Sequence, residues 1–214
     1  MSTQESAEQM ANRKSDHLDL AFQSQVGSHQ VDKRFYYEPL LSAHPQTLSE
    51  AQFGGKKVAA PIWVSSMTGG TDHAHQINHN LAKACKHFGL GMGLGSCRPL
   101  LENRERLADF SLRKIMGDDL PFYANLGIAQ VEHLLTSGKQ QAIIDLVKLL
   151  DADGLIIHIN PLQEWLQPEG DLFRQPPIDH IKRLLDISDL KIIVKETVLP
   201  LLVLHQKINF FTLT

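Results

Sequence analysis

The chain has 214 residues, and its 24 acidic side chains slightly exceed its 21 basic ones, which gives a formal net charge of −3 with histidine neutral. Apolar residues make up 43% and charged residues 21%, fractions that exclude collagen-like, fully disordered and disulfide-scaffold proteins. A protein that binds nucleic acid through its phosphates would usually show a basic surplus, so the near-neutral balance argues against a nucleic-acid partner.

Short apolar runs bounded by turn residues predict five strands, and each of the first four is followed by a segment with helical spacing. The strands are predicted at residues 58–66, 89–96, 121–126, 154–160 and 191–196. Helices are predicted at 71–88, with Thr71 or Asp72 as the cap, and at 103–116, 130–150 (broken near Ser137–Gly138) and 178–185. Residues 1–57 are predicted to form an N-terminal arm or flap, 58–196 the folded core, and 197–214 a tail without clear turn chemistry.

Strands that are apolar on both faces and alternate with helices predict a parallel sheet covered by helices. A doubly wound sheet and a (β/α) TIM-type barrel both satisfy this pattern. The barrel is favoured because polar segments follow several strands, namely SSMTGG, GSCR, NLG, HINPLQE and VKE, and a barrel builds its site from many strand ends. Since a full barrel needs ~250 residues, we expect an α/β fold with an incomplete barrel of about five of the usual eight units.

The cellular setting predicted from the sequence is cytoplasmic. The two cysteines, Cys85 and Cys97, form no CxxC pair and no zinc-site spacing, which favours a reducing compartment. No segment reaches the ~18 consecutive apolar residues of a membrane span, and the first residues lack the apolar core of a signal peptide. We therefore expect no membrane partner.

The segment from His158 to Asp171, HINPLQEWLQPEGD, gathers the most chemistry in the chain. It begins at a strand end with an imidazole, the amides of Asn160 and Gln163, and the carboxylate of Glu164. A carboxylate oxygen is a ligand that Mg²⁺ prefers, usually together with waters and phosphate oxygens. His158 and Gln163 could orient a ligand by hydrogen bonding. The alternative is a loop whose polar groups simply satisfy one another.

Three other segments offer groups suited to an anionic ligand. Arg98, in GSCR, presents a fork for phosphate, although a tight turn with a surface arginine would look the same. The segment 65–70 supplies backbone N–H groups for a flat ring or a phosphate, and Lys195 would point into the barrel mouth. Arg13 and Lys14 are adjacent cations that could clamp a polyanion, while exposed tail charges are usually just solvated.

Taken in order, the segments RKSDH, PIWVSSMTGG, GLGMGLGSCRPL, ANLG, LIIHINPLQEWLQPEGD and IVKE resemble the type 2 isopentenyl-diphosphate isomerases. The resemblance spans roughly residues 13–196. It implies an FMN-dependent (β/α) barrel in the cytoplasm, assembled as a homo-oligomer. It also implies interconversion of isopentenyl and dimethylallyl diphosphate, with Mg²⁺ and with reduced FMN that NADPH maintains.

The resemblance also implies a role for each matching residue. The substrate diphosphate would be held by Arg13, Lys14 and Arg98, and Mg²⁺ by Glu164. The residues around the substrate would be His158, Asn160 and Gln163, with Ser96 touching both substrate and flavin. The FMN would be lined by Ser66, Met67, Thr68, Asn125 and Lys195. The implied catalytic residues are His158, Gln163 and Lys195.

Two departures from the family pattern affect these expectations. Cys97 stands where the family has glutamine, so a thiol is expected beside the diphosphate in place of an amide. The match ends after Glu196, from which we expect a frameshift or premature stop, and weak FMN binding and slow or absent turnover by this chain alone. The alternatives are another FMN barrel, such as a hydroxy-acid oxidase or an inosinate-type dehydrogenase, and a non-catalytic fragment that associates with a full-length partner.

Overall fold

The computed structural model describes Leu40 and residues 51–65, 68–69, 71, 73–168, 170–196 and 212–213. Its main feature is a parallel sheet whose strands lie side by side in chain order. The strands are β3 (Trp63–Val64), β4 (Gly91–Gly93), β5 (Phe122–Gly127), β6 (Gly154–Ile159), β7 (Lys191–Glu196) and β8 (Thr212–Leu213). Sequential parallel strands with helices between them are the arrangement of part of a (β/α) barrel, so the predicted incomplete barrel is confirmed.

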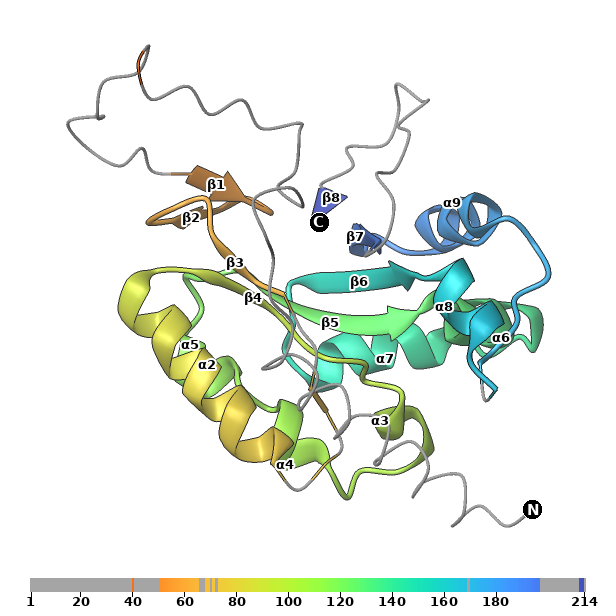
Figure 1. Ribbon diagram of the computed structural model, residues 1–214, viewed down its shortest axis with the longest axis horizontal. Helices are drawn as coiled ribbons and strands as arrows, with labels where there is room; N and C mark the ends of the chain where they lie inside the picture. The colour runs from red at the N-terminus through yellow and green to blue at the C-terminus, as the bar shows by residue number, and fades with distance from the viewer. Residues whose placement is uncertain are drawn as a thin grey trace.

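The sheet has two apolar faces of very different size. Alternate residues of β5, namely Phe122, Ala124 and Leu126, belong to the large core between the sheet and its helices. The opposite face carries a small second cluster of Tyr123, Ile156 and Ile193. Helices cover the first face in Figure 1, with α2, α6 and α7 running beneath the strands. Because side chains alternate along a strand, the second face is the inner face of the partial barrel.

Most predicted helices are present. They are α2 (Ala74–Phe88), α6 (Ile128–Thr136), α7 (Gln141–Leu149) and α9 (Pro177–Ile187), and the break between α6 and α7 falls at Ser137–Gly138 as expected. The predicted cap of α2 is wrong, because the helix begins after His73 without a side-chain capping bond. At its other end Gly89 adopts a left-handed conformation and donates its N–H to the Cys85 carbonyl, a common helix stop.

The single helix predicted at 103–116 is wrong. The structure has three short helices in this region, α3 (Pro99–Glu102), α4 (Leu107–Phe110) and α5 (Arg113–Met116). The Asn103 side chain accepts the backbone N–H of Glu105, a local bond that competes with helical pairing. The Asp109 carbonyl accepts the side-chain amide of Asn78 from α2. These contacts, together with the burial of Phe110, Leu112 and Met116, bend the chain between the short helices in place of one continuous helix.

An antiparallel hairpin that the sequence did not predict lies at the amino ends of the central strands. Its strands are β1 (Ala51–Phe53) and β2 (Lys56–Val58), joined through Gly54 and Gly55 at φ 59° and 86°. Phe53 packs against Trp63, with ring centroids 4.6 Å apart, and against Tyr123 at 6.1 Å. Figure 1 shows the hairpin on the side of the sheet away from α2 and α7. It therefore covers the end of the inner face opposite to the polar segments.

The hairpin is also tied down by charge. Lys56 Nζ lies 2.5 Å from Asp153 Oδ1, and Lys191 Nζ donates to the Gly54 carbonyl at 2.7 Å. Asp153 further accepts the backbone N–H of Phe122 and the guanidinium of Arg113. The division of the chain at residue 57 remains a prediction. Each helix in the described ranges is too short or too polar to be a membrane-spanning candidate.

Candidate functional site

Three of the predicted residues lie on the inner face, on neighbouring strands. Asn125 pairs in register with Ile156, and His158 pairs with Gly127 on one side and with Lys195 on the other. Because side chains two residues apart share a face, Asn125, His158 and Lys195 follow directly above the apolar layer of Tyr123, Ile156 and Ile193. The β7–β6 pair thus places an amine beside an imidazole at the carboxyl end of the sheet.

Burial sets the charge state of this pair. Burial and, to a smaller extent, the nearby Lys195 cation together lower the pKa of His158 from 6.5 to about 4. The imidazole is therefore neutral at neutral pH. Burial likewise lowers the pKa of Lys195, against the opposing effect of the Glu196 carboxylate. Among the described residues the buried Nε2 of His158 has no hydrogen-bond partner, so it can bond to a ligand.

Asn125 joins the ends of β4 and β5. Its buried amide donates to the Leu94 carbonyl at 2.9 Å, and its backbone carbonyl accepts the N–H of Cys97 at 2.8 Å. The Cys97 side chain is fully buried in the large core, with its thiol on the Gly95 carbonyl. The expectation of a thiol beside the diphosphate is therefore wrong, because this side chain faces the helices and not the predicted site.

The turns after β3 and β4 lie in close contact. A Cβ on Gly95 would lie 2.0 Å from the Thr68 carbonyl oxygen, so only glycine fits here. Thr68 is buried, and its hydroxyl donates to Asn78 Oδ1 at 2.7 Å. Ser96 follows in the same turn, where its hydroxyl accepts the backbone N–H of Arg98 at 3.4 Å. The close contact brings two predicted cofactor residues, Thr68 and Ser96, to neighbouring turns.

The segment after β6 forms a short helix that the sequence pattern does not predict. This helix, α8 (Pro161–Leu166), begins with proline in its first turn, a position that proline favours. Asn160 is buried and donates its amide to Glu164 Oε1 at 2.8 Å and to Gln163 Oε1 at 3.5 Å. Three predicted residues therefore form one hydrogen-bonded group at the end of β6.

Two residues that the sequence reading did not assign connect this group to Arg98. Asp171 donates its backbone N–H to Glu164 Oε2 at 2.8 Å, and its carboxylate pairs with Arg98. Gln130, in the first turns of α6, donates to the same carboxylate oxygen at 2.9 Å. Asp171 and Arg98 are 73 residues apart in the chain. Only the polar density of the QPEGD segment could have indicated Asp171, and no sequence signal indicated Gln130.

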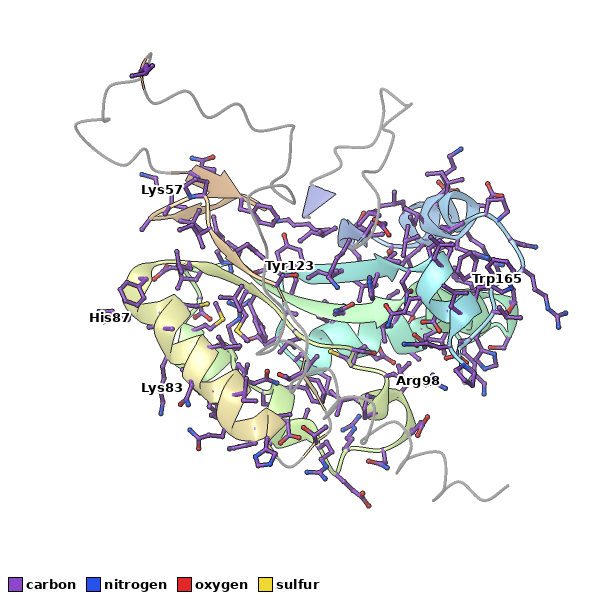
Figure 2. The ribbon with its side chains drawn as sticks, viewed as in Figure 1. Lys57, Lys83, His87, Arg98, Tyr123 and Trp165 are labelled. Carbon is purple, nitrogen blue, oxygen red and sulfur yellow. The ribbon has the colours of Figure 1, made fainter. Side chains whose placement is uncertain are left out.

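The predicted residues that the structure describes thus gather at the carboxyl ends of β3 to β7, most of them in two groups. Asn125, His158 and Lys195 are on the inner face, while Arg98, Asn160, Gln163 and Glu164 are on the loops beyond it. Figure 2 shows Arg98 and Trp165 of α8 beyond the same end of β5 and β6. Arg13, Lys14, Ser66 and Met67 lie outside the described residues. No cluster of three or more histidine, cysteine or acidic side chains in the described ranges could hold a metal ion alone.

Comparison with solved structures gives remote matches. A mandelate oxidase mutant with a monooxide FMN adduct aligns with 70% of this chain and 44% of its own length, at 14% identity and a TM-score of 0.43. The same mutant with a C4a-OH-FMN adduct aligns at 11% identity and a TM-score of 0.42. No protein-family model matches the chain.

Comparison with curated proteins gives much stronger matches. Isopentenyl-diphosphate delta-isomerase of Rickettsia felis is 36% identical over 189 residues, which cover 86% of this chain and 54% of that protein. The protein of the same name from a Synechococcus strain is 37% identical over 194 residues, or 87% of this chain and 54% of its own length. This chain spans about half the length of the curated relatives it matches, and over that span it is homologous to proteins named isopentenyl-diphosphate delta-isomerase.

Proposed function

We propose that this chain contributes to a site that isomerises isopentenyl diphosphate to dimethylallyl diphosphate by a 1,3-allylic proton shift with reduced FMN. One observation supports the proposal. The described residues that are expected to bind flavin and diphosphate gather at one end of the sheet, in a chain related to proteins named isopentenyl-diphosphate delta-isomerase. That end is where a (β/α) barrel builds its active site.

The diphosphate would bind at the loops beyond the strands. Arg98 supplies a cation there, and Ser96 lies two residues before it with a hydroxyl. The resemblance adds Arg13 and Lys14 from the N-terminal arm. Glu164 would hold Mg²⁺, which commonly takes one carboxylate together with phosphate oxygens and waters. Its donor set fits, because each Glu164 oxygen accepts one bond from protein and keeps a second lone pair for a cation.

The FMN would lie over the inner face, against Ser66, Met67, Thr68, Ser96, Asn125 and Lys195. The described residues fit polar ligands on this face: the Lys195 amine lies in a desolvated position beside His158 on the paired strand, and the buried His158 Nε2 has no bond to other described residues. When bound, reduced FMN supplies acid and base groups at its ring nitrogens without net redox change. Lys195 would stabilise negative charge on the ring, and NADPH would maintain its reduced state.

His158 on the inner face and Gln163 on α8 beyond it would contact the substrate near its allyl unit. Gln163 and the neutral His158 can hydrogen bond at the substrate without adding charge beside it. The apolar layer of Tyr123, Ile156 and Ile193 excludes water from one side of the pocket, which protects a short-lived intermediate. An inosinate-type dehydrogenase would need a loop nucleophile, and Cys97 is instead buried in the core. We further propose a cytoplasmic homo-oligomer.

The test is an anaerobic assay with FMN, NADPH, Mg²⁺ and isopentenyl diphosphate, with dimethylallyl diphosphate measured by NMR. It is run on the chain alone and on a fusion to the part of the Rickettsia felis relative outside the aligned region. The fusion should form product, and Glu164→Gln should lower its rate at least about tenfold. Exposed His87→Gln is the control substitution. A fusion that folds and binds FMN but forms no product contradicts the proposal.

A further inference from the structure

Asp171 lies between the residues proposed to hold the diphosphate and the residue proposed to hold Mg²⁺. Its carboxylate pairs with Arg98, while its backbone N–H donates to Glu164 Oε2 at 2.8 Å. One residue therefore contacts the side chains of both groups. Arg98 and Glu164 follow different strands, β4 and β6, so the contact also crosses the sheet end.

The loop that carries Asp171 is held at both ends. On one side a Cβ on Gly170 would lie 1.7 Å from the Glu164 carbonyl oxygen, so the loop approaches α8 as closely as only glycine allows. On the other side the Arg174 backbone N–H donates to both carboxylate oxygens of Glu132, at 3.0 and 2.8 Å. Glu132 belongs to α6, which packs on the sheet. The loop 170–174 is therefore held against α8 at its first residue and against α6 at its last.

The carboxylate itself is fixed as well. Gln130 donates to Asp171 Oδ2 at 2.9 Å, and that same oxygen receives Arg98. A long arginine side chain loses considerable rotamer entropy when it is ordered. A rigid carboxylate that orders the side chain before the ligand arrives lowers this cost of binding. Since a guanidinium has five N–H donors, Arg98 keeps donors for phosphate while Asp171 holds it.

We propose that Asp171 is a positioning residue, which holds Arg98 in place for a diphosphate and links it to the carboxylate of Glu164. The proposal rests on the diphosphate site of the proposed function. Asp171 touches no reacting atom in this scheme and acts through Arg98. Gln130 supports it by fixing the carboxylate oxygen that Arg98 contacts.

The experiment measures inorganic pyrophosphate binding to the chain by calorimetry at fixed Mg²⁺. Asp171→Asn keeps the backbone N–H to Glu164 and removes the charge that holds Arg98. We expect it to weaken pyrophosphate binding about tenfold, the typical effect of losing a hydrogen bond to a charged group. Asp186→Asn, the same change at an exposed position of α9, is the matched control and should leave the affinity unchanged.

A double-mutant cycle separates positioning from general disruption. In an Arg98→Ala background, Asp171→Asn should cause no further loss of affinity, because the residue that it positions is gone. A merely structural role would weaken binding equally in both backgrounds and would overturn the proposal, as would unchanged or tighter binding by Asp171→Asn. If the unsubstituted chain binds no pyrophosphate with Mg²⁺, the diphosphate site of the proposed function fails, and this proposal fails with it.

Discussion

The imidazole of His158 is uncharged at neutral pH because of its surroundings on the inner face. Burial, as the larger cause, and the charge of Lys195 on the paired strand together lower the pKa of the ring to about 4. Between about pH 4 and 6.5 the unfolded chain therefore binds more protons at this residue than the folded chain does. His158 makes the protein more stable as the pH rises through that window.

We expect the His158 ring to titrate near pH 4 in the folded protein, as followed by the chemical shifts of its ring protons. Lys195→Met should raise that midpoint, because it removes the neighbouring positive charge. The midpoint should stay below 6.5, because burial is the larger cause. A midpoint at 6.5 in the unsubstituted chain would mean that the ring is solvated and does not lie on a buried inner face.

At the scale of single elements, Asp153 connects the hairpin to the sheet. Burial alone would raise the pKa of its carboxyl, but hydrogen bonds from Lys56, the Phe122 amide and Arg113 outweigh burial and hold the pKa below its ordinary value. Since the folded pKa is depressed, the stabilisation is present above the unfolded pKa of about 3.9. It is lost as the pH falls through the folded value.

Asp153→Asn should therefore lower the free energy of unfolding at pH 7 by about 1–3 kcal/mol, because three donors lose their charged acceptor. The loss should shrink as the pH falls below 4 toward the depressed pKa of the folded carboxyl, because the charge then contributes less to stability. Urea unfolding at pH 7 and at pH 3 measures the difference. Asp145→Asn, on the exposed face of α7, is the control. An equal loss at both pH values would show that packing, not charge, holds the hairpin.

Strands and helices could be predicted from the sequence where the residues of the segment itself determine its structure. β5, β6 and β7 are nearly continuous apolar runs bounded by turn residues, so they stand out against polar surroundings. The region 99–116 broke into short helices because Asn78 and Asp153, from elsewhere in the chain, bind the Asp109 carbonyl and the Arg113 side chain. The Arg98–Asp171 pair could not be predicted from the sequence either. The two residues are distant along the chain, and only the folded sheet brings them into contact.

At the scale of the whole molecule, the site end carries an exposed apolar surface. We define the α8 patch as Leu162, Trp165, Leu166 and Leu172, of which Trp165 is 71%, Leu166 75% and Leu172 72% exposed. Figure 2 shows Trp165 on α8, at the end of the molecule where the polar segments lie. Exposed apolar side chains that are gathered in one short segment indicate a surface that binds another protein surface. The homo-oligomer proposed above would place such association between copies of the chain.

We expect the chain to self-associate with rising concentration, as measured by sedimentation velocity. The double substitution Trp165→Gln and Leu166→Gln should weaken that association at least about tenfold, because a large buried apolar side chain contributes about 1.5–3 kcal/mol. Its melting temperature should change little, since both side chains are already exposed. Phe88→Gln, at an exposed position at the end of α2, is the matched control for removing one large apolar group. If the Phe88 variant loses association and the α8 variant does not, the contact between copies lies on the helix layer, away from the site end.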